Sequence, residues 1–464
     1  MRKLKTVASL LLAVVITGLS AITPAFADYD PGFDVDAEAV YFINLDTGKV
    51  IYEKDADKKV YPASTTKIMT ALLALENIPD LDTPQIELKL YIQNALSGTG
   101  ASLAGILRGE TFTPRELLYA ALLPSGNEAA MMLGDYVGDG SLDYFAEMMN
   151  EKAAELGAVN THFVNASGMH DDDHYTTAYD MYLITMAALE NETFREIVST
   201  NYYYAGEDQN GNPLHWNTTN FLISPGSTYY YPYATGVKTG TTDEAGRCLV
   251  STAEKDGYHY LMVMMGAPQY DSNGEKLEEN MVFKQTIELY DWAFSSFSNK
   301  TLIEKDVGVG EVPLKLARGG KDYLLIKSGE VFTDLLPNEI EASSITMELD
   351  LPAVVNAPIK EGDQVGTIRL MLAGEEIGSV PAVAAEDVDA SLIATLIDQF
   401  KRLFRSFLAK FIVVFVILSI IAYITITVLR GRNKNRYYRR RDSFFRIIPQ
   451  QFNNAYKKHR AFRR

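Results

Sequence analysis

The stretch Tyr61-Pro62-Ala63-Ser64-Thr65-Thr66-Lys67-Ile68-Met69-Thr70-Ala71-Leu72-Leu73-Ala74-Leu75-Glu76 places a serine and a lysine at the start of an apolar run. The pattern predicts a helix from Thr65 to Glu76. Because this helix is apolar nearly all round, we expect it to be buried. Residues three apart share one face of a helix, so Lys67 can reach the hydroxyl of Ser64 within one turn.

This pair has the chemistry of an activated nucleophile. A serine hydroxyl is a poor nucleophile until a base takes its proton. Lys67 can be that base only if its pKa is lowered, by desolvation or by a nearby positive charge. The backbone N–H of Ser64, at a helix N-terminus, can help to hold an oxyanion. The spacing alone is a weak signal, because an N-cap serine beside a solvated lysine gives the same pattern.

Ser125-Gly126-Asn127 is the second candidate motif. The hydroxyl of Ser125 can relay protons between Lys67 and a leaving amine. The amide of Asn127 can hold a substrate carbonyl. An isolated tripeptide of this composition is more often an ordinary turn.

Lys238-Thr239-Gly240-Thr241 is the third motif, in a sequence typical of a strand. Lys238 and Thr239 offer a cation and a donor, which together can bind a substrate carboxylate. Gly240 permits close approach of a substrate backbone. The N–H of Thr241 is a possible second oxyanion donor, and Lys238 can help to keep Lys67 neutral.

The three motifs in this order are the signature set of penicillin-binding proteins and class A β-lactamases. Over roughly 34–388 the chain resembles the low-molecular-mass penicillin-binding proteins of the serine D-alanyl-D-alanine carboxypeptidase family. The similarity extends beyond the motifs to Phe163-Val164-Asn165-Ala166-Ser167-Gly168 and Pro358-Ile359-Lys360-Glu361-Gly362-Asp363-Gln364-Val365-Gly366. It implies that Ser64 is acylated, Lys67 is the general base, Ser125 relays protons and Lys238 binds a carboxylate. In many members Asp follows S-G-N, whereas here the residue is Glu128.

The resemblance implies removal of the terminal D-alanine from peptidoglycan stem peptides, and acylation of Ser64 by β-lactams. A β-lactamase is one alternative, but 158–180 holds no E-x-x-x-N with which class A enzymes activate water. A catalytically idle penicillin-binding scaffold or sensor is another, and an endopeptidase that cuts cross-links is a third. We expect no cofactor, no metal and no nucleic-acid partner. Asp171-Asp172-Asp173-His174 is interpreted as a solvated loop.

The fold class implied is α/β, a transpeptidase-like domain with an antiparallel sheet and helices at 28–299. Tyr41 to Tyr52 predicts a hairpin, and Arg247 to Ala253 with Tyr258 to Met265 predicts another across Asp256-Gly257. Thr113-Pro114-Arg115-Glu116 predicts a capped helix start. Short alternating runs punctuated by Gly and Pro predict a separate all-β domain at 300–386.

The two ends of the chain predict export and anchoring. Basic residues, an apolar run from Val7 to Leu19 and Ala25-Phe26-Ala27 are typical of a signal peptide at 1–27, with an uncleaved anchor as the alternative. An amphipathic helix is expected at 387–410, suited to a lipid surface. The uncharged run 411–429 predicts a transmembrane helix.

The distribution of charge predicts the orientation in the membrane. The formal net charge is −17, yet the tail 430–464 holds ten Arg and three Lys against one Asp. By the positive-inside rule this basic tail is cytoplasmic. We therefore expect a single-pass protein of the cell membrane whose catalytic domain is extracellular.

Overall fold

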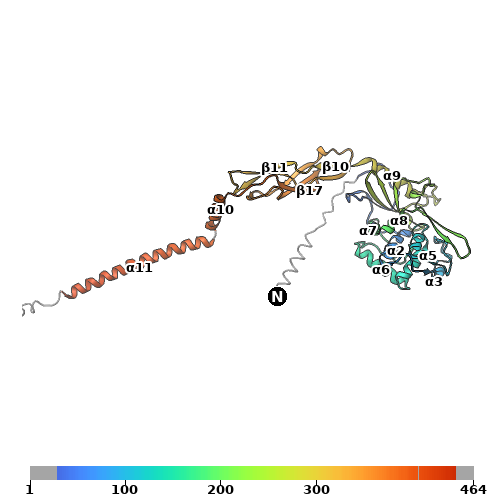
Figure 1. The fold of residues 1–464 in the computed structure, drawn as a ribbon, viewed down its shortest axis with the longest axis horizontal. Coiled ribbons are helices and arrows are strands. Elements are labelled where there is room, and N and C mark those ends of the chain that lie inside the picture. Colours follow the sequence, from blue (N-terminus) through green and yellow to red (C-terminus); the bar gives the residue numbers. More distant parts are fainter. Residues whose placement is uncertain (1–28, 406, 446–464) are drawn as a thin grey trace, which may run out of the picture. The chain divides into compact units, whose positions relative to one another are not determined.

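The computed structural model describes residues 29–405 and 407–445. The chain divides into two compact units (Figure 1). Within the described residues, the first unit comprises 29–303, Phe332–Thr346 and Leu370–Gly378, and the second comprises Glu304–Val331, Met347–Arg369 and 379–445. The predicted signal peptide lies outside the described residues.

The first unit is built on a five-stranded sheet in the order β2-β1-β9-β8-β7. All four strand pairs are antiparallel. The strands are β1 (Ala39–Asn44), β2 (Val50–Lys54), β7 (Ala234–Thr242), β8 (Gly246–Lys255) and β9 (Tyr258–Ala267). Both predicted hairpins, β1 with β2 and β8 with β9, are therefore confirmed. The K-T-G motif lies on β7, at an edge of the sheet.

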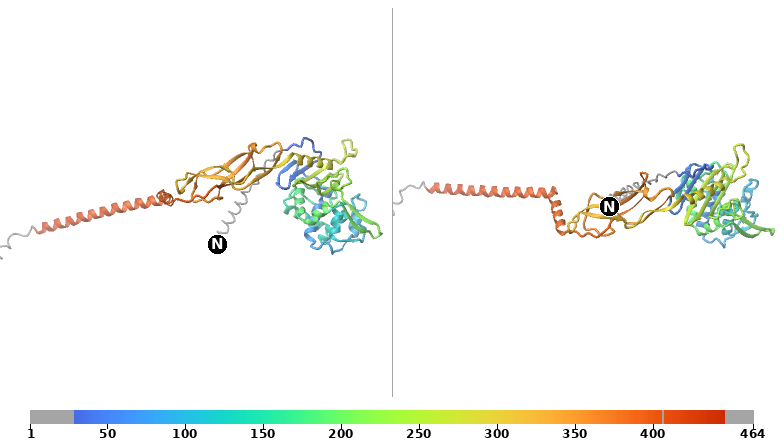
Figure 2. Two further views of the ribbon diagram at one scale, coloured as in Figure 1. Left: turned by 45° about the horizontal axis from the view of Figure 1, so that its top comes forward. Right: turned by 90° about the horizontal axis from the view of Figure 1, so that it is seen from above.

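Both faces of the sheet are covered. Side chains of a strand alternate between the two faces, so Val250 and Val263 join one core cluster while Leu249 and Met262 join the other. The first cluster includes residues of α2 (Lys67–Asn77), α4 (Pro114–Leu122), α5 (Asn127–Val137), α6 (Leu142–Glu155) and α7 (Ala178–Leu189). The second is formed with α9 (Met281–Ser296). Figure 2 gives two further views of this layered arrangement, which confirms the predicted α/β class.

Smaller elements complete this unit. They include two short helices, α3 (Leu90–Leu96) and α8 (Glu192–Ser199), and the 3-10 turn η2 (Phe221–Ile223). They also include two short antiparallel strand pairs, β3 (Ile86–Glu87) with β4 (Thr111–Phe112) and β5 (Tyr202–Glu207) with β6 (Pro213–Asn217). Strand β10 (Phe297–Ile303) pairs with β13 (Phe332–Pro337), and η3 (Ala342–Ser344) follows.

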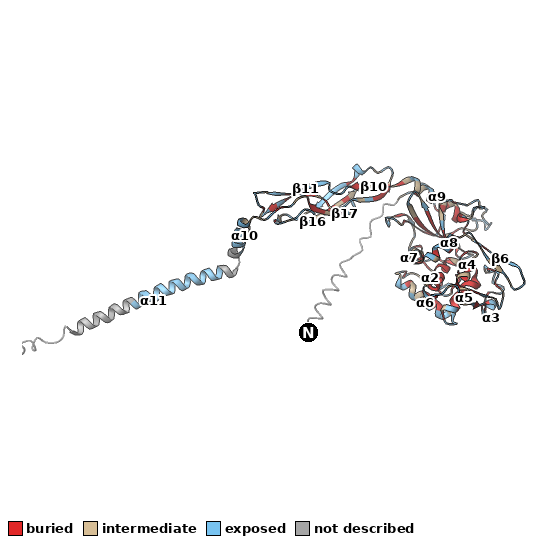
Figure 3. Cartoon of the chain, viewed as in Figure 1, coloured by how far each residue is buried: buried red, intermediate tan, exposed pale blue. Residues whose placement is uncertain are grey.

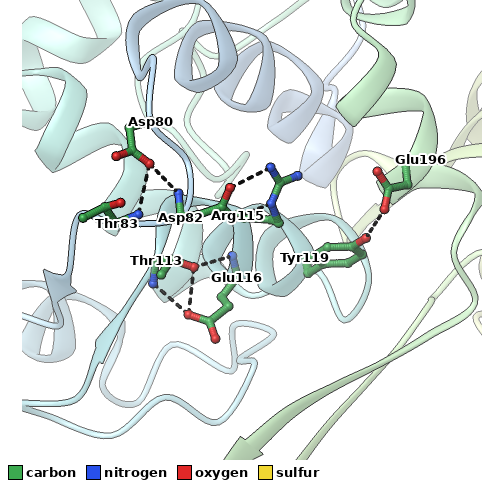
Figure 4. A network of polar contacts seen from close by, with 8 residues as sticks. All are labelled: Asp80, Asp82, Thr83, Thr113, Arg115, Glu116, Tyr119 and Glu196. Atoms are coloured by element: carbon green, nitrogen blue, oxygen red, sulfur yellow. Dashed lines mark hydrogen bonds and ion pairs between the residues drawn. The ribbon is translucent and has the colours of Figure 1, made fainter.

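The start of α4 has the predicted capping box. The side chain of Thr113 accepts a hydrogen bond from the backbone N–H of Glu116, and the Glu116 carboxylate accepts one from the backbone N–H of Thr113 (Figure 4). Two donors that a helix start leaves without partners are thereby satisfied. Arg115 on the same turn forms an ion pair with Asp82. The cap fixes the helix that leads to Ser125.

The predicted helix at Thr65 begins differently from the expectation. Residues Ala63–Thr66 form a 3-10 turn, η1, and the α-helix α2 starts at Lys67. The prediction of burial is confirmed, because Lys67 to Ala74 are all buried. Figure 3 shows α2 and the central strands as mainly buried.

The second unit contains most of a six-stranded sheet in the order β14-β16-β17-β12-β11-β15. Its strands are β11 (Gly308–Lys315), β12 (Tyr323–Ser328), β14 (Thr346–Asp350), β15 (Val355–Asn356), β16 (Gln364–Leu372) and β17 (Glu375–Ala384). Leu324 and Ile326 are buried whereas Tyr323 and Leu325 are exposed. This alternation is typical of a sheet with one face against a core.

Two helices follow the second sheet. The amphipathic segment forms α10 (Leu392–Arg405), which is shorter than the predicted 387–410, and exposes Leu392, Ile393, Leu396, Ile397 and Phe400. The next helix, α11, spans Phe407–Phe445. Within it Lys410–Arg430 has a mean hydropathy of 2.9, and none of that stretch is buried (Figure 3). It is the one helix in the described ranges that is long and apolar enough to cross a membrane.

Candidate active site

The 3-10 turn before α2 carries Ser64. Ala63 has a positive φ of 46°. Two threonines tie the turn together: the hydroxyl of Thr65 donates to the carbonyl oxygen of Pro62 at 2.7 Å, and that of Thr66 donates to the carbonyl oxygen of Ala63 at 2.8 Å. These bonds hold the turn in a tight conformation that presents Ser64 to a cavity beside β7.

Lys67 is completely buried and touches Ser64. Its Nζ lies 2.9 Å from Ser64 Oγ, 2.6 Å from Asn127 Oδ1 and 2.7 Å from the carbonyl oxygen of Ser167. In the neutral form, the amine can donate to the two carbonyl oxygens and accept a proton from the serine hydroxyl. The predicted contact between serine and lysine is therefore present.

The electrostatics of the site favour that neutral amine. Burial, followed by the charge of Lys238, holds the pKa of Lys67 well below its ordinary value, and the carboxylate of Glu128 acts in the opposite direction. A buried ammonium loses its hydration, and a second cation nearby disfavours it further. The two expected causes of a lowered pKa, desolvation and a nearby positive charge, are therefore both present.

The S-x-N segment lies at the start of α5. Ser125 adopts a positive φ of 63°, and its buried Oγ has no hydrogen-bond partner among the described residues. Gly126 is packed so tightly that a Cβ there would lie 2.8 Å from the Cβ of Ala104 and 2.9 Å from the carbonyl oxygen of Ala120. The glycine therefore allows this segment to approach its neighbours, while Asn127 orients Lys67 through its carbonyl oxygen.

The K-T-G segment of β7 lies against the serine turn. Nζ of Lys238 donates to the carbonyl oxygen of Thr239 at 3.0 Å, and burial lowers the pKa of Lys238 to about 7. A Cβ on Gly240 would lie 2.8 Å from the carbonyl oxygen of Pro62 and 3.0 Å from the backbone nitrogen of Ser64. From the sequence, Gly240 was expected to permit close approach of a substrate backbone. The structure adds that the glycine lets β7 and the serine turn approach each other.

Residues of these segments line an open cavity of about 240 Å³. Among the predicted site residues, Ser64, Ser125, Thr239, Gly240 and Thr241 line it, whereas Lys67, Asn127 and Lys238 are not among its lining residues. The remaining lining residues are Ser102, Thr219, Phe221, Arg247, Cys248, Asn280, Val282 and Phe283. The hydroxyls of Thr219 and Thr239 lie 2.5 Å apart.

Glu128 has a structural role that its motif did not reveal. Its Oε1 accepts hydrogen bonds from the backbone N–H groups of Ala104, Gly105 and Ile106. Burial raises the pKa of this carboxyl, and the backbone donors oppose the rise. Glu128 therefore fixes the chain just after Ser102, which lines the cavity.

His174 supports the serine turn from behind. The expectation of a solvated loop at 171–174 is wrong for this residue, because His174 is buried with an exposed fraction of 2%. Its Nδ1 accepts from the backbone N–H of Val164 and its Nε2 lies 2.8 Å from the hydroxyl of Thr66. Since that hydroxyl already donates to Ala63, the proton is on Nε2. Burial lowers the pKa of His174 to about 4.

Comparison with known proteins agrees with this geometry. Residues 25–269 match the family described as D-alanyl-D-alanine carboxypeptidase, and residues 297–390 match the penicillin-binding protein 5 C-terminal domain. The chain belongs to the D-alanyl-D-alanine carboxypeptidase family. This confirms the family identified from the three motifs, the transpeptidase-like fold and the activity of a serine-type carboxypeptidase. Members of this family act on D-Ala-D-Ala peptides and bind penicillin.

Three relatives show how far the similarity extends. The carboxypeptidase is 30% identical to D-alanyl-D-alanine carboxypeptidase DacF of Bacillus subtilis (strain 168), over 84% of this chain and 97% of the relative. It is 27% identical to DacA of Escherichia coli (strain K12), over 80% and 88%. The crystal structure of DacD from Francisella tularensis superposes with a TM-score of 0.60 at 25% identity, over 80% of this chain and 98% of that one.

Proposed function

We propose that Ser64 is the nucleophile with which this carboxypeptidase removes the terminal D-alanine from peptidoglycan stem peptides. The observation that carries the proposal is the 2.9 Å contact between Ser64 Oγ and the fully buried Nζ of Lys67. In the first step Lys67 takes the proton of Ser64, and Oγ attacks the carbonyl carbon of the penultimate D-alanine. This requires a neutral amine, which the lowered pKa of Lys67 supports.

The acyl-enzyme forms when the peptide C–N bond breaks. The departing amine of the terminal D-alanine takes a proton from Lys67, with Ser125 Oγ as the relay between them. Water then attacks the ester carbon, Lys67 takes a proton from it, and Ser64 recovers its own. The backbone N–H groups of Ser64 and Thr241 are the proposed oxyanion donors. Asn127, Lys238, Thr239 and Gly240 complete the proposed substrate-binding set.

Covalent labelling tests this assignment. A fluorescent penicillin is expected to label the wild-type protein and to leave Ser64→Ala unlabelled, with equal thermal unfolding of the two proteins. Ser125→Ala is the comparison variant, because it removes a hydroxyl from the same cavity without removing the nucleophile. Full labelling of folded Ser64→Ala contradicts the proposal.

Product analysis separates the competing functions. Incubation of the 28–410 ectodomain with a pentapeptide ending in D-Ala-D-Ala is expected to release free D-alanine. A protein that is labelled by penicillin but releases no D-alanine is an idle scaffold. One that hydrolyses the penicillin rapidly is a β-lactamase, and one that cuts a cross-linked dimer in preference to the pentapeptide is an endopeptidase.

We also propose the domain limits and topology drawn from the sequence. Residues 1–27 form the signal peptide, 28–299 the catalytic domain, 300–386 the β-rich domain, 387–410 the juxtamembrane helix, 411–429 the span and 430–464 the cytoplasmic tail. The apolar helix Lys410–Arg430 and the basic composition after it support this order. The catalytic domain then faces the outside, where peptidoglycan lies.

A further inference from the structure

The cavity beside Ser64 contains an arginine that none of the sequence motifs includes. Arg247 lies on β8 directly opposite Thr241 of β7, and it lines the same cavity as Ser64. Strand β7 carries the K-T-G motif, so Arg247 is held in register with that motif by backbone hydrogen bonds between two strands. Its position is therefore fixed by the sheet and not by a loop.

Arg247 is buried, and among the described residues no ion pair joins its guanidinium to a carboxylate. The residue is 9% exposed, and its single hydrogen bond in the described part of the chain joins Nη1 to the carbonyl oxygen of Glu279 at 3.0 Å. The carboxylate of Glu279 instead pairs with Lys284. A buried cation without an anionic partner is costly. The guanidinium still has donors to offer to a ligand in the cavity.

Arg247 suits a carboxylate better than Lys238 does. Lys238 is only 1% exposed and does not line the cavity. Arginine stays charged in proteins, and its planar guanidinium can bind both oxygens of a carboxylate. Thr239 and Thr241 line the same cavity and can add donors.

We propose that Arg247 binds the C-terminal carboxylate of the departing D-alanine, and the carboxylate of penicillin, by direct contact. This rests on the proposed role of the Ser64 cavity as the substrate site. Lys238, which does not line the cavity, then acts through its positive charge, which helps to keep Lys67 neutral and adds to the field that attracts the carboxylate. Arg247 is thus a specificity residue that favours substrates with a free C-terminus.

Matched substrates test the role of Arg247. The rate of D-alanine release from a D-Ala-D-Ala peptide is compared with the rate of D-alaninamide release from the same peptide amidated at its C-terminus. We expect Arg247→Gln to lower kcat/KM by about 10–100-fold on the free acid, the range of a charge-assisted hydrogen bond. On the amide we expect a change below about threefold. Arg318→Gln, an exposed arginine in the second unit, is the control and is expected to alter neither rate.

The outcomes separate this inference from the proposed function. Arg247→Lys keeps a cation at this position and is expected to retain part of the preference for the free acid over the amide. If Arg247→Gln does not fold, the acid and amide rates of Arg247→Lys test the role of Arg247 instead. Equal losses on acid and amide in a folded variant, or no loss on either, overturn the role of Arg247. A wild-type protein that neither releases D-alanine nor is labelled at Ser64 overturns the proposed function itself.

Discussion

Replacing Lys67 by arginine tests the proposed base most directly. The three partners of its Nζ lie at 2.6, 2.7 and 2.9 Å, and two of them are carbonyl oxygens that only accept. The third, Ser64 Oγ, must give up a proton for acylation to start. Arginine offers five N–H donors and no acceptor, and it remains charged. The variant therefore carries a permanent positive charge and cannot take the proton.

The expected loss follows from the role of a general base. Such a base contributes about 10²–10⁴-fold to the rate, which corresponds to about 3–5 kcal/mol of activation free energy. We expect Lys67→Arg to lower the acylation rate by this factor. The residual rate reflects the oxyanion donors and substrate binding, which the substitution leaves in place. The assay is the second-order rate constant for labelling by a fluorescent penicillin, with D-alanine release as an independent readout.

Lys238→Arg is the matched control. It is the same substitution at a second buried lysine, but the proposed task of Lys238 needs only a positive charge. We expect this variant to retain part of its activity, with a larger loss on a free-acid peptide than on the amidated one. Thermal unfolding shows whether each variant is folded. Acylation of folded Lys67→Arg within tenfold of wild type, or equal failure of the two variants, refutes this division of roles.

Three other outcomes follow from the geometry. Glu128→Ala leaves three backbone N–H groups without their acceptor and is expected to lower the free energy of unfolding by about 3 kcal/mol, measured by urea titration. Glu128→Gln keeps an acceptor oxygen and is expected to lose less, so equal losses in the two variants contradict this reasoning. Since the folded pKa of His174 is about 4 against 6.5 unfolded, stability is complete above pH 6.5 and falls by up to about 3 kcal/mol as the pH drops to 4. His174→Gln lacks this contribution, so parallel pH profiles of the two proteins disprove it. Protease added to protoplasts is expected to remove the catalytic domain and spare an epitope placed after Arg464, and the reverse pattern means that the orientation is wrong.

Local pattern was sufficient to predict several elements of the domain that holds the motifs. The apolar run after Lys67 identified a buried helix, Asp256-Gly257 identified the β8–β9 hairpin, and Thr113 with Glu116 identified the start of α4. Each of these signals is contained in a few consecutive residues. The exact start of α2 was not predictable, because the 3-10 turn at Ala63–Thr66 is held partly by contacts with distant residues.

The supporting residues of the site could not be identified in this way. Glu128 binds backbone groups 22–24 residues earlier in the chain. His174 contacts a threonine 108 residues away. Arg247 enters the cavity because β8 pairs with β7. In the sequence alone, Glu128 is an acidic residue after a motif, His174 is a histidine in a polar segment and Arg247 is an arginine in a predicted strand, so none of them indicates its role.

The environment of Lys67 explains how one carboxylate can lie near the base without abolishing its function. The charge of Glu128 raises the pKa of Lys67, while burial and the charge of Lys238 lower it. Oε1 of Glu128 faces three backbone donors, and no hydrogen bond or ion pair joins Glu128 to Lys67 among the described residues. Much of its negative charge is therefore directed at the chain after Ser102. Desolvation has the largest effect on the pKa of Lys67, so burial of the amine is the main reason that it can act as a base.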